Sequence, residues 1–341
     1  MGPNLAHEAS TTARDGQNFA KQASFSVHEA KTSSGKLQPG DVRPFFGHAT
    51  PGDALLSLRL KDAGLPRARR DHSILLATWN VRELGRRRRR DDSIAMIARV
   101  LERFSLVSLV ELRRDTGDLE RILAHLGPAW RALYSEPLDD PGANEERACF
   151  LFDTRFVQHT GLVSIVEGRR RRVGQEYVAP TWWRRPYMAG FRAGAVELVL
   201  VTAHIRWGGK SKRARLPEIT ALAEWAEARG RQKGHAVSLV LAGDFNVPDT
   251  TGPLYRALER RGLTLPKALL GAHGTSLAAD KRYDQILHLP ALAERFTERA
   301  GVVDFYRGDY RSLYPSTRLT KERFTREISD HLPLWAEMHV G

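Results

Sequence analysis

The segment 239–248, Leu-Val-Leu-Ala-Gly-Asp-Phe-Asn-Val-Pro, constrains the fold more than any other stretch of the chain. Residues 236–242 form a nearly continuous apolar run bounded by glycine, which is typical of a short strand buried on both faces. The run ends at Asp244 and Asn246, whose side chains would point to the same side of an extended backbone. Burying polar groups there is costly unless they meet a metal, a nucleophile or a substrate. The segment therefore predicts a functional site, with an ordinary turn before Pro248 as the alternative.

Other apolar runs also carry polar residues at their ends. The runs and their polar residues are 74–79 with Asn80, 106–110 with Glu111, 148–152 preceded by Glu146, 198–203 with His204, and 283–287 with Asp284. A last strand alternates from Leu334 to Val340 and follows Asp330 and His331. Between these runs, residues 91–101 and the segments after Pro217 and Pro253 predict helices.

Composition limits the class of protein. The chain has 341 residues, 42% of them hydrophobic, which allows one large or two modest domains with a substantial core. Lysine and arginine number 53 against 40 acidic residues, so the net charge of +13 predicts a polyanionic partner or an anionic surface. The single cysteine, Cys149, excludes an internal disulfide and a cysteine-based zinc site. We find no apolar run of membrane-span length and no signal-peptide pattern, so we expect a cytoplasmic protein, and we expect a monomer.

We expect two parts in the chain. Residues 1–71 are poor in aliphatic periodicity and predict a mobile leader, although leucines in 55–60 could form a short helix docked on the body. Residues 72–341 predict one large domain without internal repeats.

Eight short motifs occur in a fixed order along this domain: Thr78-Trp79-Asn80, Val110-Glu111, Glu146-Arg147, Arg185-Pro186-Tyr187, Thr202-Ala203-His204, Gly243-Asp244-Phe245-Asn246, Tyr283-Asp284 and Ser329-Asp330-His331. Together they resemble the endonuclease/exonuclease/phosphatase superfamily, and within it the deoxyribonuclease I-like branch, over essentially all of residues 72–341. The resemblance implies an α/β fold in which two packed sheets are flanked by helices, a four-layer α/β/β/α sandwich.

The resemblance also implies roles for single residues. It makes His331 a general base oriented by Asp284, and His204 with Glu146 a second pair on the other side of the phosphate. It further implies that Asp244 and Asn246 orient the water and the phosphoryl oxygens, that Glu111, Asp330 and Asn80 hold Mg²⁺ or Mn²⁺, and that Arg185 binds phosphate. Hard oxygen ligands suit these cations, and phosphodiester hydrolysis needs charge neutralisation, an activated water and a stabilised leaving oxygen.

Several positions depart from the motifs of the superfamily, and two of these departures disfavour particular subfamilies. Val110 stands where many members carry glutamine, which removes a possible hydrogen bond behind Glu111. Abasic-site endonucleases carry asparagine where His204 stands, and the string Arg282-Tyr283-Asp284-Gln285 lacks the Trp-Cys-Asp-Arg sequence of inositol-polyphosphate phosphatases. Sphingomyelinase-like members remain compatible with the motifs, although we would expect exposed apolar loops in them where this chain has arginine-rich ones.

Basic clusters indicate what the site would act on. Arg169, Arg170, Arg171 and Arg172, together with Trp182, Trp183 and Arg184, are candidates for contacting a nucleic-acid backbone, since an aromatic beside cations can stack on a base. The run 86–90 is another candidate, with a solvated basic surface as the alternative. We therefore predict a divalent-metal-dependent phosphodiesterase, in the first instance a nuclease acting on DNA. The alternatives are a phosphatase or phospholipase on a smaller phosphate ester and a catalytically idle nucleic-acid-binding module.

Overall fold

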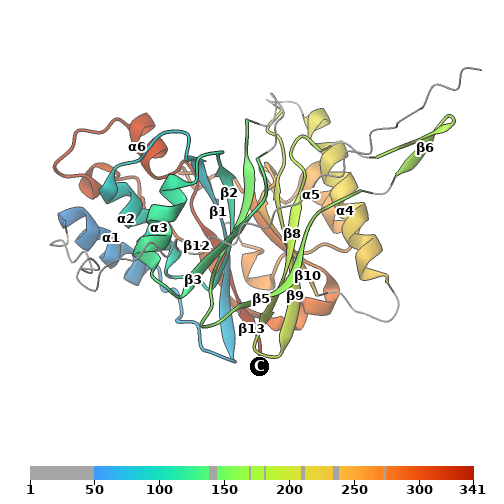
Figure 1. Ribbon diagram of the computed structural model, residues 1–341, viewed down its shortest axis with the longest axis horizontal. Helices are drawn as coiled ribbons and strands as arrows, with labels where there is room; N and C mark the ends of the chain where they lie inside the picture. Colours follow the sequence, from blue (N-terminus) through green and yellow to red (C-terminus); the bar gives the residue numbers. More distant parts are fainter. Residues whose placement is uncertain are drawn as a thin grey trace, which may run out of the picture.

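Two β-sheets lie face to face in the computed structural model, and helices cover the outer face of each sheet (Figure 1). The structure describes residues 50–137, 144–168, 170–179, 182–208, 212–232, 238–271 and 274–341. The first sheet has the strand order β12-β13-β1-β2-β4-β3, the second has the order β11-β10-β9-β8-β5, and β6 pairs with β7 in a separate hairpin. The predicted four-layer α/β sandwich is confirmed.

The elements have the following bounds. The strands are β1 (Ser73–Leu84), β2 (Leu106–Leu112), β3 (Trp130–Tyr134), β4 (Arg147–Asp153), β5 (Gln158–Ile165), β6 (Arg171–Val173), β7 (Glu176–Val178), β8 (Tyr187–Ala193), β9 (Val196–His204), β10 (Leu239–Asp244), β11 (Asp284–His288), β12 (Phe296–Val302) and β13 (Leu334–His339). The α-helices are α1 (Pro51–Asp62), α2 (Asp91–Leu101), α3 (Gly117–Leu126), α4 (Leu216–Gly230), α5 (Pro253–Glu259) and α6 (Lys321–Glu327). Short 3-10 helices are η1 (Lys212–Ala214), η2 (Lys267–Leu269), η3 (Pro290–Arg295) and η4 (Arg311–Leu313).

The first sheet is buried on both faces, and alternate residues of its central strands enter different cores. In β1, Ile74 and Leu76 pack toward the second sheet, whereas Leu75 and Trp79 pack toward the helices outside the first sheet. The predicted face of β13, from Leu334 to Val340, lies between the sheets, while Trp335 enters the helix-side core. The structure therefore shows that the alternation seen in the sequence of β13 marks only one of two buried faces.

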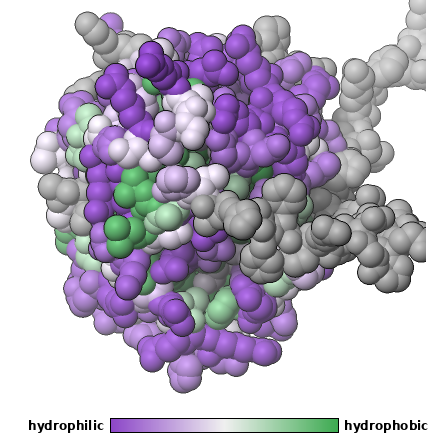
Figure 2. All heavy atoms as spheres, turned by 90° about the vertical axis from the view of Figure 1, so that its left-hand side faces the viewer, coloured by the Kyte–Doolittle hydropathy of each residue, from purple (hydrophilic) through white to green (hydrophobic). Residues whose placement is uncertain are grey.

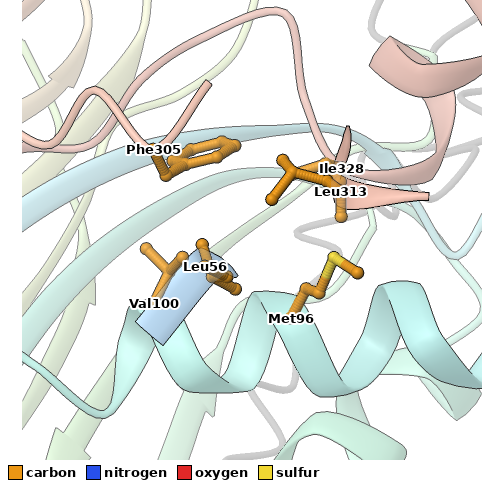
Figure 3. Close-up of a pocket in the computed structure, with 6 residues that line it drawn as sticks. All are labelled: Leu56, Met96, Val100, Phe305, Leu313 and Ile328. Carbon is orange, nitrogen blue, oxygen red and sulfur yellow. The ribbon is translucent and has the colours of Figure 1, made fainter. Parts of the chain in front are cut away.

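Helix α1 corrects the predicted domain boundary. Residues 50–71 lie inside the predicted leader, but Leu56 and Leu60 are 1% and 2% exposed and belong to the helix-side core. Leu56 points into an apolar pocket together with side chains of α2 and of the C-terminal segment (Figure 3): Met96, Val100, Phe305, Leu313 and Ile328. The helix is thus part of the body, as the docking alternative anticipated, and the predicted boundary at residue 71 is wrong. Residues 1–49 lie outside the described residues.

Polar contacts fix α1 as well. Arg59 is buried, and its Nη1 donates to the carbonyl oxygens of Phe305, Tyr306 and Asp309, each at 3.0 Å. Gly52 lies so close to η4 that an added Cβ would stand 2.0 Å from the carbonyl oxygen of Leu313. Helix α1 can therefore approach the C-terminal segment only because residue 52 has no side chain.

The outer surface over the helices of the first sheet is mostly hydrophilic, with a few small hydrophobic areas (Figure 2). Such a surface is typical of amphipathic helices whose apolar faces are turned inward. In the part of the chain that the structure describes, no helix combines the length and the apolar character that a membrane span requires.

Candidate active site

The polar residues predicted at strand ends come together at one end of the strands of both sheets. Asn80 of β1 joins the sheets, because its Nδ2 donates to Glu111 Oε1 of β2 at 2.9 Å and to Asp244 Oδ2 of β10 at 3.1 Å. Strand β1 does not end at Asn80 but continues to Leu84, with an irregular pairing to β2 between these two residues. Such irregularities redirect side chains, and this one lies where Asn80 turns toward the second sheet.

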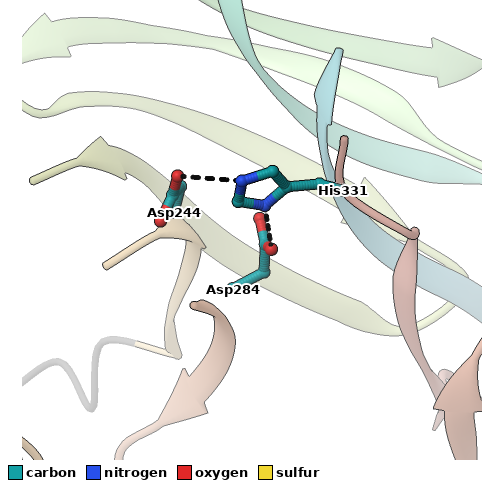
Figure 4. A group of neighbouring side chains, drawn as sticks. All are labelled: Asp244, Asp284 and His331. Carbon is teal, nitrogen blue, oxygen red and sulfur yellow. Dashed lines mark hydrogen bonds and ion pairs between the residues drawn. The ribbon is translucent and has the colours of Figure 1, made fainter. Parts of the chain in front are cut away.

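His331 forms the first imidazole–carboxylate pair of the site (Figure 4). Its Nδ1 is 2.7 Å from Asp284 Oδ2, and its Nε2 is 3.8 Å from Asp244 Oδ2. The backbone of His331 is held on both sides, since its N–H donates to Ser329 Oγ at 2.8 Å and its carbonyl accepts from Trp79 Nε1 at 2.9 Å. Burial disfavours the charged imidazole, but the carboxylates of Asp284 and Asp244 outweigh it and raise the pKa of His331 to about 10.

His204 forms a second pair of the same kind. Its Nδ1 is 2.7 Å from Glu146 Oε2, and its Nε2 is 3.7 Å from the same Asp244 oxygen that His331 approaches. Burial lowers the pKa of His204, but Glu146 more than compensates, so the pKa is raised. Glu146 is also contacted by Arg184 Nε at 2.6 Å and lies 3.7 Å from Arg113 Nη1. The buried carboxylate is therefore balanced by two guanidinium groups as well as by the imidazole.

Asp244 thus lies between the two imidazoles. Its other oxygen, Oδ1, accepts the backbone N–H of Asn246 at 2.9 Å. The side-chain amide of Asn246 donates to the carbonyl oxygen of Ile205 at 2.7 Å and so ties the loop after β10 to the loop after β9. Glu111 and Asn246 have left-handed backbone conformations, with φ of 67° and 51°. This region costs a residue such as Glu111 about 1–3 kcal/mol, and residues held in it cluster at functional sites.

Oxygen ligands for a divalent cation are present. Burial would raise the pKa of Glu111, but His204, the Asn80 amide and the Glu83 N–H lower it to about 2, so the carboxylate is charged. Asn80 Oδ1 is buried and has no hydrogen-bond partner among the residues that the structure describes. The Asp330 carboxylate is half exposed and lies 3.4 Å from Arg82 Nη1. An orphaned carbonyl oxygen beside a buried anionic carboxylate fits a hard cation such as Mg²⁺. Within the described residues, Asp244, Asp284 and His331 also place ligand atoms within 4.8 Å of one another.

Comparison with known proteins identifies the family. The model described as Endonuclease/Exonuclease/phosphatase family matches residues 77–331, a range that contains both imidazole–carboxylate pairs. The chain belongs to this family. Its members hydrolyse phosphoester bonds and usually use divalent metal ions, so the chain is a member of a phosphoesterase family. No curated protein matches the sequence.

Solved structures agree in fold. An endonuclease/exonuclease/phosphatase family protein from Bacteroides thetaiotaomicron shares 20% identity, with a TM-score of 0.55 over 79% of this chain and 95% of that one. A mannosyl-6-phosphatase from the same organism shares 19%, with a TM-score of 0.53 over 77% and 98%. The human Nocturnin catalytic domain with bound sulfate shares 15%, with a TM-score of 0.53 over 79% and 95%. At such identities the likeness establishes the fold alone.

Two residues that were predicted to contact nucleic acid, Trp182 and Arg184, do not lie on the surface as expected. Trp182 was predicted to contact nucleic acid, but it is buried in the core and its Nε1 donates to the carbonyl oxygen of Glu218 at 3.1 Å, so that prediction is wrong. Arg184, predicted to contact the nucleic-acid backbone, instead points into the site and contacts Glu146. Arg185, predicted to bind phosphate, is exposed. Trp183 is 40% exposed.

The basic clusters differ in their surroundings. Arg169 lies outside the described residues, whereas Arg170 and Arg172 are exposed at the β6–β7 hairpin, which extends away from the body (Figure 1). Arg171 belongs to β6 by its backbone. In the run 86–90, Arg89 is buried and its guanidinium donates to the carbonyl oxygens of Glu327 and Ile328, so this arginine is structural.

Sequence reasoning missed two residues at or beside the site. Arg113 contacts both Glu83 and Glu146, and nothing in the local sequence distinguishes it from other surface arginines. Trp207 is exposed beside the site. The sequence could have indicated it, because a tryptophan three residues after His204 is unusual in a polar loop.

Proposed function

We propose that the chain is a divalent-metal-dependent phosphodiesterase that hydrolyses nucleic acid, with DNA as the favoured substrate. One observation carries this proposal: Nε2 of His204 and Nε2 of His331 approach the same oxygen of Asp244, at 3.7 and 3.8 Å. Each imidazole has a buried carboxylate on its other nitrogen, which is the arrangement that general acid–base chemistry requires. A module that only binds nucleic acid would need neither pair.

In this proposal the neutral form of His331 accepts the proton of the attacking water at Nε2, while Asp284 holds Nδ1 and stabilises the imidazolium that forms. The pKa of about 10 belongs to the metal-free protein, and a cation bound beside these carboxylates would lower it. Asp244 orients the water. His204 donates to a phosphoryl or leaving oxygen from the opposite side, and Glu146 fixes its orientation. A divalent cation held by Glu111, Asn80 and Asp330 would supply neutralisation of the phosphate charge.

Charge favours a nucleic-acid substrate. The chain carries +13, and Arg170 and Arg172 are exposed on a hairpin that extends from the body. Trp183 is exposed and lies under the guanidinium of Arg206, at 5.4 Å from the ring centroid, as expected of a surface that meets phosphates and bases together. Arg185 is exposed and could reach phosphates that flank the scissile one.

A second candidate, a phospholipase, is favoured by one observation. The same hairpin exposes Val173, Tyr177 and Val178, at 64%, 71% and 46%. Apolar and aromatic side chains beside arginines also suit the interface of an anionic membrane. Hydrolysis of phospholipid vesicles without any cleavage of DNA or RNA would select this candidate.

Cleavage assays on several substrates test the proposal. Purified protein is incubated with supercoiled plasmid, linear duplex, single-stranded DNA and RNA, each with Mg²⁺, with Mn²⁺ or with chelator. We expect metal-dependent cleavage of DNA. The variant His331→Ala should lower turnover by about 10²- to 10⁴-fold, the usual contribution of a positioned base. His125→Ala, which changes an exposed histidine of α3, should leave turnover unchanged. Near-normal cleavage by His331→Ala would refute the mechanism.

A further inference from the structure

Trp207 is an exposed indole with a fixed position beside the proposed catalytic centre. It follows His204 by three residues and is 47% exposed. The guanidinium of Arg215 lies over the ring, 4.9 Å from its centroid, and the ring of Tyr283 meets it at 84° with centroids 5.5 Å apart. Nearly half of a large aromatic residue therefore remains open to solvent although two neighbours already hold it.

Both neighbours connect Trp207 to the site. Arg215 is 3% exposed, and its Nη1 donates to the carbonyl oxygen of Asn246. The ring of Tyr283 lies 5.8 Å from the ring of His331, between centroids. A ligand group resting on Trp207 would consequently be adjacent to a phosphate held between His204 and His331.

The segment that carries Trp207 is braced by α4. Arg206 Nε lies 3.0 Å from Glu218 Oε1 and donates to the carbonyl oxygen of Ala214 at 3.1 Å. Since the segment is already ordered, binding to Trp207 would cost little conformational entropy. An indole that is held by a guanidinium and a second ring, and is still 47% exposed, offers a fixed aromatic surface on which a flat group can stack.

The chemistry around the indole favours a nucleobase. The groups that touch it are a guanidinium and a phenol ring, both flat, and a nucleobase is a further flat group that stacks on an indole. We propose that Trp207 stacks on a base of the substrate next to the scissile phosphate and thereby selects nucleotides over other phosphate esters. This inference rests on the proposed phosphodiesterase function and adds a specificity residue to it.

Steady-state kinetics on small substrates test the inference. The substrates are a deoxydinucleotide and two analogues in which one or the other nucleoside lacks its base. Trp207→Ala should raise KM for the deoxydinucleotide by roughly 5- to 150-fold, the usual contribution of one stacked base, with kcat little changed. On the analogue that lacks the stacked base, Trp207→Ala and the unchanged enzyme should have the same KM. Trp207→Phe should restore most of the affinity. Leu58→Ala, which removes a 55% exposed apolar side chain from α1, should have no effect on these substrates.

A binding assay separates this inference from the proposed function. In the His331→Ala background, deoxynucleoside monophosphates should quench tryptophan fluorescence, and deoxyribose 5-phosphate should not; the further change Trp207→Ala should abolish the quenching. If no phosphate ester is hydrolysed, the proposed function fails while this assay still tests Trp207. Equal KM increases on base-bearing and abasic substrates would overturn the inference. It would equally be overturned if Trp207→Ala impaired hydrolysis of a hexose phosphate and left the deoxydinucleotide unaffected.

Discussion

His331 lies among carboxylates on several sides: Asp284 at Nδ1, Asp244 near Nε2, and Asp330 next to it in the chain. These charges stabilise its protonated form in the metal-free protein. At the residue scale, the buried charged groups of the site therefore interact with one another. Replacing one of these residues should change the pKa values of the others.

The raised pKa of His331 predicts that the stability of the metal-free protein depends on pH. The pKa of His331 is raised from 6.5 to about 10 on folding. Its contribution to the free energy of unfolding is therefore fully present below about pH 6.5 and is lost as the pH rises toward 10. Urea unfolding in chelator at pH values from 6 to 10 should show this loss, and His331→Asn should show a shallower dependence. Identical slopes in the two proteins would contradict the raised pKa.

Glu111 gives a prediction about metal. Its carboxylate accepts from Asn80 and from the Glu83 N–H, and we propose that it also binds the cation. Glu111→Ala should weaken metal affinity, so that raising the Mg²⁺ concentration restores part of the lost activity. Glu120→Ala, which changes an exposed carboxylate of α3, provides the control. If titration calorimetry gives the same Mg²⁺ affinity for Glu111→Ala and the unchanged protein, Glu111 is not a ligand.

At the element scale, α1 shows how a segment with weak local signals becomes part of the core. The helix presents Leu56 and Leu60 to α2 and the C-terminal segment, while Leu58 on its other side is 55% exposed. Its leucines are too few to define a periodic apolar face, but they fill a pocket that other elements provide (Figure 3).

A matched pair of leucines tests this docking. Leu56→Ala should lower the free energy of unfolding by about 2–5 kcal/mol, because it removes buried methyl groups and leaves a cavity. Leu58→Ala, on the same helix and of the same chemistry, should change it by less than about 0.5 kcal/mol. Both values come from denaturant unfolding. Similar small effects of the two changes would show that α1 is not docked in solution.

At the scale of the whole molecule, the two ends of the sheets carry different side chains. The imidazole–carboxylate pairs lie at one end of β1, near Asn80, and the exposed Arg69 and Arg70 lie before its other end. If DNA binds at the site and extends along the molecule, the arginines of the β6–β7 hairpin should contribute to its affinity, and those at the opposite end of the sheets should not.

Salt dependence measures this difference. Each phosphate contact with duplex DNA contributes about −0.9 to the slope of log K against log salt concentration. The double variant Arg170→Ser/Arg172→Ser should therefore flatten the slope by up to about 2, whereas Arg69→Ser/Arg70→Ser should leave it unchanged. Fluorescence anisotropy with a labelled duplex, between about 50 and 200 mM salt, gives both slopes. Equal slopes in all three proteins would mean that the hairpin does not contact the backbone.

The sequence by itself predicted the strands next to the site residues, the helices α2, α4 and α5, and the chemical types of the site. These follow from local signals: apolar runs predicted β1, β2, β9 and β10, and an unpaired polar group after a buried strand is costly enough to indicate a site at Asp244. The order of the motifs then predicted the family, which the family model over residues 77–331 confirms.

Only the tertiary structure decided which groups touch. His331 meets Asp284 across 47 residues, His204 meets Glu146 across 58, and both imidazoles approach one oxygen of Asp244. It also decided that Trp182 is buried while Trp207 is exposed, and that α1 belongs to the body. Periodicity and turn chemistry act over a few neighbouring residues, whereas burial and charge pairing depend on side chains supplied by distant segments. For this reason the sequence could indicate the components of the site but not their contacts.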